Sequence, residues 1–247
     1  MIKSARYVSA LAAVQLAACS AQPASNSEEA RVLAGPASPD ASSAPAAAQA
    51  KPHERLVLAL GDSLYAGYGV DQSQSLPTVL ERELAARGIR ARVVNAGVSG
   101  DTSAGGLERL EWALQGDVRV LIVALGANDG LRGLPPDQLQ RNLSEVIERA
   151  QARGITVILA GMEAPPNYGR DYIVSFHNVY PALAQRYRVA FVPFLLQGVA
   201  GTPSLNQSDG IHPTAAGARI VADNVWAVLR PIVDAQRDTT HGRRPGS

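Results

Sequence analysis

Asp209 and His212 stand three residues apart in the segment D-G-I-H-P, with Pro213 directly behind them. A carboxylate can orient an imidazole as a general base, but such a base is useful only beside a nucleophile or a water molecule. The pair also has a purely structural interpretation, because Asp can cap a helix that begins near Pro213 while His lies in its first turn. A catalytic interpretation therefore requires a third group from elsewhere in the chain.

Ser63, in G-D-S-L, is the candidate for that third group. A serine at the end of a strand can point its hydroxyl into a cleft, while a short helix behind it offers free backbone N–H groups to developing negative charge. Its structural alternative is a helix cap. Ser99 is the rival nucleophile, but G-V-S-G-D lacks the final glycine of the G-x-S-x-G elbow. We expect Ser63, His212 and Asp209 to form a catalytic triad.

Acyl transfer also needs hydrogen-bond donors for the oxyanion of the tetrahedral intermediate. The candidates are the backbone N–H of Ser63, a glycine N–H within 97–106 and the side-chain amide of Asn128. Asn128 has an alternative role, since Asn often holds its own loop through bonds to the backbone, and the residues alone leave both roles open. A phosphate loop is disfavoured, because 97–106 contains neither G-x-x-x-x-G-K-[ST] nor a lysine. No cluster has metal-ligand spacing, so we expect no metal and no cofactor.

The elements that must position these residues alternate between short apolar runs and longer segments of helical period. Near-continuous Val, Ile and Leu is typical of strands covered on both faces. The predicted strands are 55–60, 91–95, 118–125, 155–160 and 189–193, and the predicted helices are 76–87, 104–114, 136–153, 171–187 and 213–233. This alternation predicts a single flavodoxin-like, doubly wound α/β/α sandwich with a five-stranded parallel sheet. In such sheets ligands bind beyond the carboxyl ends of the strands, where the candidate residues fall.

Four short blocks in this order resemble the motifs of the SGNH (GDSL) hydrolases: G-D-S-L at 61–64, G-D-T at 100–102, G-A-N-D at 126–129 and D-G-I-H-P at 209–213. The resemblance covers about 56–233. Within the family, the chain most resembles the bacterial arylesterases and the multifunctional thioesterase I/lysophospholipases. It implies that Ser63 is the nucleophile and that His212 is the base oriented by Asp209. It also implies an oxyanion hole formed by the Ser63 amide, Gly100 and Asn128.

The same resemblance implies which residues bind the substrate. A mobile loop that closes over the acyl chain is expected at Gly130, Leu131, Arg132, Gly133, Leu134 and Pro135, with further contacts from Asn167 and Tyr168. Tyr65 departs from the family pattern of Ser or Thr, and we expect its ring to narrow or rebuild the cleft.

The activity implied by the resemblance is hydrolysis of carboxylic esters through an acyl-enzyme, without a cofactor. The expected substrates are aryl esters, lysophospholipids and acyl-thioesters. The alternatives are a carbohydrate O-acetylesterase of the cell envelope and, in a different class, a non-catalytic lipid-binding lipoprotein.

The start of the chain resembles a lipoprotein signal peptide over 1–19. Lys3 and Arg6 precede an apolar run that is too short to span a membrane, and L-A-A-C at 16–19 resembles a lipobox. Cys19 is the only cysteine, and lipidation would remove a reactive thiol from an oxidising compartment. The alternative is an ordinary cleaved signal with an incidental cysteine. Ser20 follows, where lipoproteins kept at the inner membrane tend to carry Asp, so we expect a lipid anchor at Cys19 in the bacterial outer membrane, facing the periplasm.

The remaining segments complete the predicted organisation. The Ala, Ser and Pro-rich stretch 20–53 has too little apolar surface to offset the entropy of ordering it, and we expect a disordered tether. The hydrolase domain is expected over 54–235, with a flexible tail over 236–247. The net charge is +1 with both signs interspersed, which predicts no nucleic-acid partner. We expect a monomer whose partners are an ester substrate and a membrane.

Overall fold

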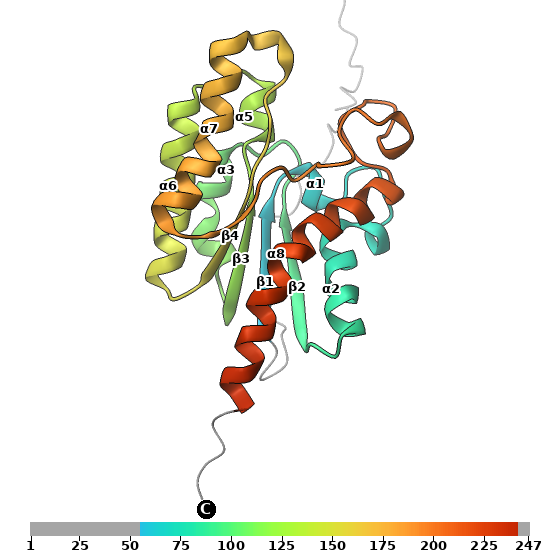
Figure 1. Ribbon diagram of the computed structural model, residues 1–247, viewed down its shortest axis with the longest axis vertical. Coiled ribbons are helices and arrows are strands. Elements are labelled where there is room, and N and C mark those ends of the chain that lie inside the picture. The colour runs from blue at the N-terminus through green and yellow to red at the C-terminus, as the bar shows by residue number, and fades with distance from the viewer. Residues whose placement is uncertain (1–54, 242–247) are drawn as a thin grey trace, which may run out of the picture. The chain divides into compact units, whose positions relative to one another are not determined.

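The computed structural model describes residues 55–241 and places five parallel strands in one sheet (Figure 1). The strand order is β2-β1-β3-β4-β5. The strands are β1 (Arg55–Gly61), β2 (Ala91–Gly97), β3 (Val118–Ala124), β4 (Thr156–Ala160) and β5 (Ala190–Val192). The order reverses between β1 and β3, which is the switch point where ligands bind in flavodoxin-like sheets. The predicted five-stranded parallel sheet is confirmed.

Helices cover both faces of this sheet (Figure 1). On one face lie α2 (Leu76–Ala86) and α8 (Ala215–His241). On the other lie α3 (Ser103–Glu108), α6 (Pro136–Ala152) and α7 (Arg170–Tyr187). The shorter elements are α1 (Ser63–Ala66), η2 (Gln72–Gln74), α4 (Leu110–Ala113), α5 (Ala127–Leu131), η3 (Pro166–Tyr168) and η4 (Pro203–Leu205). The doubly wound α/β/α sandwich is therefore as predicted.

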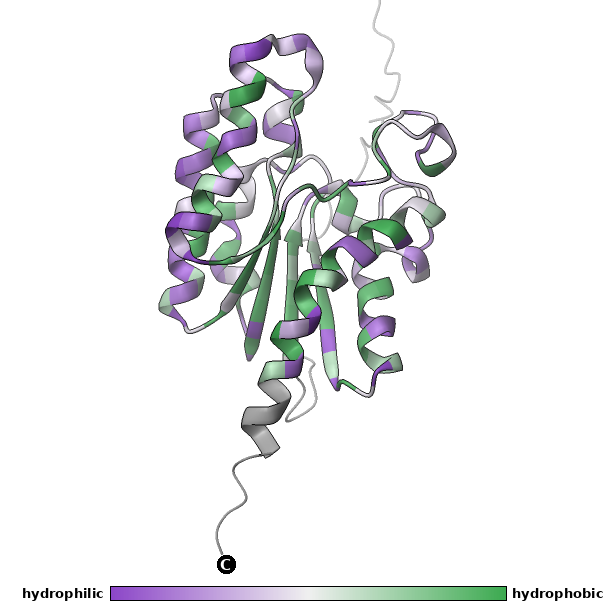
Figure 2. Ribbon diagram, in the orientation of Figure 1, coloured by the Kyte–Doolittle hydropathy of each residue, from purple (hydrophilic) through white to green (hydrophobic). Residues whose placement is uncertain are grey.

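The hydrophobic pattern of the chain accounts for these layers. Figure 2 shows the strands as almost continuously hydrophobic, whereas the helices alternate between hydrophobic and hydrophilic positions. Residues 120–125 of the central region are all buried, as a strand between two helix layers requires. Helix α6 buries a single stripe at helical spacing, made up of Leu139, Leu143, Val146, Ile147 and Ala150.

Two helices differ from their predicted bounds. The segment 104–114 is not one helix, because the helical conformation is interrupted at Arg109, between α3 and α4. The last helix begins at Ala215 rather than at Pro213, because Pro213 pairs with Asn206 as an isolated antiparallel bridge and the Thr214 N–H donates to the Leu205 carbonyl at 2.9 Å. At its other end α8 continues to His241, into the predicted tail. The interruption at Arg109 and the start of α8 both accompany tertiary contacts, and the hydrophobic periodicity of a sequence carries no information about such contacts.

Tyr65 lies in α1 and points into the core, not into the cleft. Its side chain is fully buried, and a Cβ on Gly61 would lie only 2.7 Å from its ring. The expectation that this ring narrows or rebuilds the cleft is therefore wrong. The Tyr65 hydroxyl has no hydrogen-bond partner among the described residues, whereas the equally buried Tyr180 donates to the Leu125 carbonyl at 3.1 Å.

These two tyrosines give a matched pair of stability predictions. We expect Tyr180→Phe to lower the free energy of unfolding by about 1 kcal/mol, because a made hydrogen bond is lost. Tyr65→Phe should leave it unchanged or raise it, because the hydroxyl that is removed is buried and unpaired. Urea unfolding of both variants beside the parent measures the difference. A larger loss for Tyr65→Phe than for Tyr180→Phe contradicts this ranking.

Candidate active site

Ser63 is the first residue of α1, directly beyond the carboxyl end of β1. Asp62 caps this helix, since its Oδ1 accepts the Leu64 N–H at 3.0 Å. Asp62 is only 1% exposed, and burial raises its pKa to about 6, although its hydrogen bond with Leu64 opposes the shift. The cap fixes the turn that follows β1 and holds the serine hydroxyl at the switch point of the sheet.

Ser63, His212 and Asp209 form one chain of short contacts. His212 Nε2 lies 2.8 Å from Ser63 Oγ, and His212 Nδ1 lies 2.6 Å from Asp209 Oδ2. The other carboxylate oxygen, Oδ1, accepts the backbone N–H groups of Ile211 at 2.9 Å and of His212 at 3.0 Å. The structure thus brings together the three residues that the sequence predicted to meet, in the geometry of a nucleophile, a base and an orienting acid.

The charge on Asp209 determines which ring nitrogen of neutral His212 carries the proton. The backbone N–H of His212, then its ring and the N–H of Ile211, lower the pKa of Asp209 to about 2. Above that pH the carboxylate is charged and only accepts hydrogen bonds, so the ring proton of neutral His212 lies on Nδ1. Nε2 is then left free to accept the proton of Ser63.

Tyr68 and Gln207 also hold His212 against the serine loop, and sequence reasoning missed both. The Tyr68 ring lies on the imidazole, with centroids 4.5 Å apart and planes inclined by 37°. Gln207 Nε2 donates to the Tyr68 carbonyl at 2.8 Å and to the Pro213 carbonyl at 3.0 Å, which joins the two loops. No motif in the sequence marks either residue, because each acts through a partner far away in the chain.

A cleft of about 300 Å³ opens at the serine. Its polar lining comes from Ser63, Ser99, Gly100, Asn128 and His212. Its apolar lining comes from Leu64, Tyr68, Ala127, Leu131, Met162, Leu196 and Ile211. Gly100 adopts a φ of 85°, in the left-handed region that favours glycine. The cleft therefore combines hydrogen-bonding groups at one point with an otherwise apolar wall.

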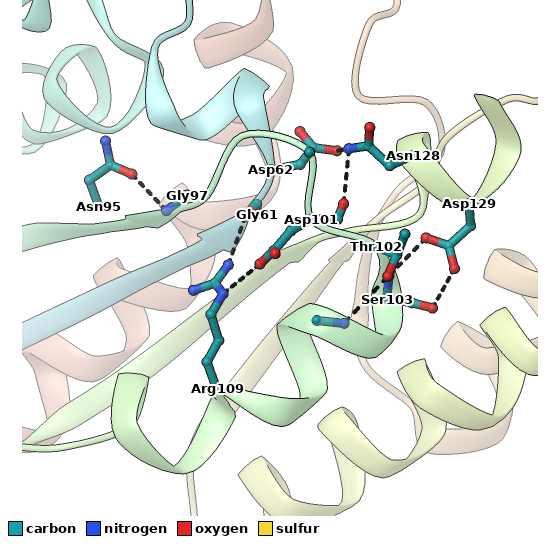
Figure 3. A network of polar contacts seen from close by, with 12 residues as sticks. Gly61, Asp62, Asn95, Gly97, Asp101, Thr102, Ser103, Arg109, Asn128 and Asp129 are labelled. Atoms are coloured by element: carbon teal, nitrogen blue, oxygen red, sulfur yellow. Dashed lines mark hydrogen bonds and ion pairs between the residues drawn. The ribbon is translucent and has the colours of Figure 1, made fainter. Parts of the chain in front are cut away.

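Asn128 carries out the structural role that the sequence left open and also faces the cleft. Its Nδ2 donates to the Asp101 carbonyl at 2.9 Å and makes a longer contact of 3.4 Å with Asp62 Oδ2 (Figure 3). The first contact ties the loop after β3 to the loop after β2. The second is close to the limit of a hydrogen bond and leaves that N–H weakly engaged.

Arg109 and Asp129 clamp the loops that carry these groups (Figure 3). Arg109 Nε contacts Asp101 Oδ2 at 2.6 Å, and its Nη2 donates to the Gly61 carbonyl at 2.9 Å. Asp129 is 2% exposed and accepts the N–H of Ser103 at 2.7 Å and its hydroxyl at 2.6 Å. The peptide units beside Ser63 and Gly100 are thereby held at a fixed separation. Arg109 stands outside the motifs, so no pattern in the sequence marked it.

We expect Arg109→Met to lower the free energy of unfolding by roughly 3 kcal/mol, because it leaves the Asp101 carboxylate, whose side chain is 17% exposed, without its cation. The kcat for an ester should fall about tenfold or more, since displaced oxyanion donors lose transition-state stabilisation. The matched control is Arg119→Met. Arg119 pairs with Asp117, but these side chains are 58% and 65% exposed, so the change should be within about 0.5 kcal/mol. Urea unfolding and steady-state kinetics measure both; equal effects of the two variants contradict the clamp.

Of the predicted substrate-binding residues, Leu131 is the one that lines the cleft among the described residues. Arg132 Nη2 donates to the Gly100 carbonyl at 2.8 Å, and the Tyr168 hydroxyl donates to the Leu131 carbonyl at 2.8 Å. A third contact joins the Tyr172 hydroxyl to the Leu134 carbonyl at 2.8 Å. Gly130, Gly133, Leu134, Pro135 and Asn167 do not line it. The segment expected to cover the acyl chain is held in this structure by two tyrosine hydroxyls.

The remaining predictions concern metals, membrane helices and the N-terminal segment. Between residues 55 and 241, no three His, Cys, Asp or Glu side chains gather as the ligands of a metal would. No helix in this range combines the length and apolar character needed to cross a bilayer. The predicted signal peptide with Cys19 and the predicted tether lie outside the described residues.

Comparisons with known proteins show the family of this chain. The sequence profile of the GDSL-like Lipase/Acylhydrolase family matches residues 59–220. The chain is 47% identical over 178 residues to the esterase TesA of Pseudomonas aeruginosa, covering 72% of this chain and 89% of that protein. It is 38% identical over 179 residues to thioesterase 1/protease 1/lysophospholipase L1 of Escherichia coli, covering 72% and 85% respectively. The crystal structure of AlinE4, an SGNH-hydrolase family esterase, matches with a TM-score of 0.62 and 42% identity over 80% of this chain and all of that chain.

Proposed function

This chain belongs to the GDSL-like lipase/acylhydrolase family, whose members include SGNH esterases, and we propose that Ser63, His212 and Asp209 are its catalytic triad. The protein is a carboxylic ester hydrolase. The observation that carries the assignment of the triad is the contact of 2.8 Å between Ser63 Oγ and His212 Nε2, continued at 2.6 Å from His212 Nδ1 to Asp209.

The mechanism follows from the order of these contacts. His212 takes the proton of Ser63 on Nε2 as Oγ attacks the carbonyl carbon, and the charged Asp209 stabilises the imidazolium that forms. The proton on Nε2 then passes to the leaving alcohol or thiol, and the C–O or C–S bond breaks. Water attacks the acyl-enzyme with His212 again as base, which releases the carboxylic acid and restores Ser63.

The oxyanion is stabilised by the Ser63 N–H, the Gly100 N–H and the Asn128 amide. The Ser63 N–H is the first of α1, and the first N–H groups of a helix have no partner within it. The Asn128 N–H that lies 3.4 Å from Asp62 is weakly engaged and can turn to the oxyanion. A single such donor contributes roughly 3 kcal/mol to the transition state.

The apolar wall of the cleft supports an acyl chain as the acid part of the substrate. Seven apolar or aromatic side chains and no Asp, Glu, Lys or Arg line it. A sugar would leave its hydroxyls unpaired against such a wall, at a cost of about 1–3 kcal/mol for each buried polar group. We therefore propose esters, thioesters and lysophospholipids with apolar acyl chains as substrates.

A substrate panel tests this function. We expect hydrolysis of p-nitrophenyl esters with chains longer than acetyl, of acyl-thioesters and of lysophospholipids, with Ser63→Ala as the inactive blank. Activity confined to acetylated sugars would favour a carbohydrate O-acetylesterase. A parent chain that is folded but inactive on the whole panel would favour a non-catalytic lipid-binding role.

The location that we propose is the outer membrane of a bacterial envelope, with the chain anchored through a lipid on Cys19. The support is the lipobox-like L-A-A-C at 16–19 and the absence of any second cysteine in the sequence. We expect Cys19→Ser to move the protein from the membrane fraction to the soluble fraction after cell lysis. Separation of the two fractions by centrifugation, followed by detection of the chain, measures this. Retention of the variant with the membranes, as strongly as the parent, contradicts a lipid anchor.

A further inference from the structure

Seven large hydrophobic side chains are exposed in the described part of the chain, and five of them lie beyond the carboxyl ends of the strands. Each of the five follows a different strand: Tyr68 after β1, Val98 after β2, Leu131 after β3, Tyr168 after β4 and Ile211 after β5. Their exposure ranges from 38% for Tyr168 to 54% for Tyr68. We call these five residues the apolar rim.

The apolar rim surrounds the mouth of the cleft. Tyr68, Leu131 and Ile211 line the cleft themselves, and Val98 directly precedes Ser99, which also lines it. Tyr168 lies beside Leu131, since its hydroxyl donates to the Leu131 carbonyl at 2.8 Å. The apolar wall of the cleft therefore continues onto the surface. Exposed apolar patches of this kind mark sites of interaction.

We propose that the apolar rim docks onto the surface of a phospholipid bilayer, so that an acyl ester passes from the lipid directly into the cleft. The choice of a lipid as occupant rests on the proposed function. Tyr and aliphatic side chains on one face are typical of proteins that lie in the membrane interface, where tyrosine places its hydroxyl among the headgroups.

The charge beside the rim favours phospholipid over a second copy of the chain. Arg132 follows Leu131, is exposed, and forms no ion pair with any of the described residues. Its Nη2 donates to the Gly100 carbonyl at 2.8 Å. An exposed guanidinium beside an apolar surface fits a phosphate group in the headgroup layer. A two-fold dimer through the rim would close both clefts, whereas docking on a bilayer leaves each cleft open to the lipid.

The predicted anchor is compatible with this orientation. Arg55 begins β1 at the amino end of the sheet, whereas the apolar rim lies beyond the carboxyl ends. The seven residues of β1 span roughly 23 Å. A coil with the number of residues in the predicted tether 20–53 would reach ~30 Å, which exceeds this span and would allow the rim to face the bilayer of the proposed anchor.

Two labelled positions test the docking. Val98 and Trp112 are 44% and 45% exposed. Val98 lies in the rim, whereas Trp112 lies in α4, beside Glu111, which pairs with Arg153 near the amino end of β4. In the full chain carrying Cys19→Ser, either V98C or W112C supplies the single thiol, which is labelled with a polarity-sensitive fluorophore. The vesicles contain phosphatidylcholine and phosphatidylglycerol, with or without nitroxide-labelled lipid as quencher.

We expect vesicles to shift the emission of the label at position 98 to the blue and nitroxide lipid to quench it several-fold, while the label at position 112 changes little. Equal quenching at both positions, or no change at position 98, overturns the proposal. The proposal is also overturned if the emission at position 98 shifts to the blue without vesicles and sedimentation shows dimers, because a second copy of the chain then covers the rim.

A separate readout keeps the proposed function apart from the docking. Labelling of Ser63 by a fluorophosphonate verifies that each variant is folded with an intact site. If the fluorophore at position 98 does not insert into vesicles although fluorophosphonate reacts normally with Ser63, only the docking proposal is contradicted. Absent fluorophosphonate labelling in a folded parent chain counts against the proposed function, whichever way the vesicle experiment turns out.

Discussion

Ser63→Ala should lower the kcat for every ester and thioester by about 10⁴- to 10⁶-fold. The variant keeps the cleft, the imidazole and the oxyanion donors but lacks the oxygen that forms the acyl-enzyme. His212 Nε2, which lies 2.8 Å from Ser63 Oγ in the parent, then faces no nucleophile. Steady-state kinetics with p-nitrophenyl esters and labelling by a fluorophosphonate measure the loss.

Ser99→Ala is the matched control for this prediction. Ser99 lines the same cleft and is the rival nucleophile by sequence, but the hydroxyl that contacts His212 Nε2 is that of Ser63. We expect Ser99→Ala to keep fluorophosphonate labelling and most of the activity. If Ser63→Ala were labelled and Ser99→Ala were not, the nucleophile would be Ser99 and the triad would be wrongly assigned.

Asp209→Asn should lower kcat/KM by about 10⁴-fold while preserving the fold. Oδ1 of Asp209 accepts the backbone N–H groups of Ile211 and His212, so the new amide keeps its oxygen at that position. Its NH₂ group then occupies the place of Oδ2 and donates to His212 Nδ1. The ring proton moves to Nε2, and the imidazole can no longer accept the proton of Ser63. NMR of ¹⁵N-labelled histidine reports which ring nitrogen is protonated.

The pH dependence of Asp209 sharpens this test. Hydrogen bonds to the charged form lower its pKa to about 2, from 3.8. The stability that this charge contributes is present above pH 4 and is lost as the pH falls through about 2. A loss of activity between pH 7 and pH 4 therefore does not arise from protonation of Asp209. The control is Asp137→Asn, which removes a carboxylate from a surface ion pair with Arg141 and should have the kcat/KM of the parent. An Asp209→Asn variant within tenfold of the parent contradicts the orienting role.

The sheet was predictable from the sequence because each strand is a short run of Val, Ile, Leu and Ala between two helix layers, a pattern with few other interpretations. The break at Arg109 was not, since the local pattern over 104–114 is helical and the break accompanies contacts with Gly61 and Asp101. Gly61 lies 48 residues away along the chain. Local periodicity carries no information about such a partner.

The candidate site divides in the same way. Ser63, Gly100, Asn128, Asp209 and His212 stand in short motifs; four of them line one cleft, and Asp209 contacts the ring of His212. Tyr68 and Gln207, whose contact spans 139 residues, carry no motif and emerge only from the fold. Apart from Leu131, the apolar lining was not predicted for a similar reason, because Met162 and Leu196 look like ordinary core residues until the loops around them are placed.

Asp209 and His212 share one short loop, and the carboxylate is bonded to the backbone of that loop as well as to the ring. The acid and the base therefore form a preassembled unit, because the contact between carboxylate and imidazole is made within one short loop. For protein engineering this means that the segment can be grafted as a unit onto other scaffolds. The host then has to align its own hydroxyl with Nε2 of the ring, and to supply the oxyanion donors and the contact with the ring that Tyr68 makes here.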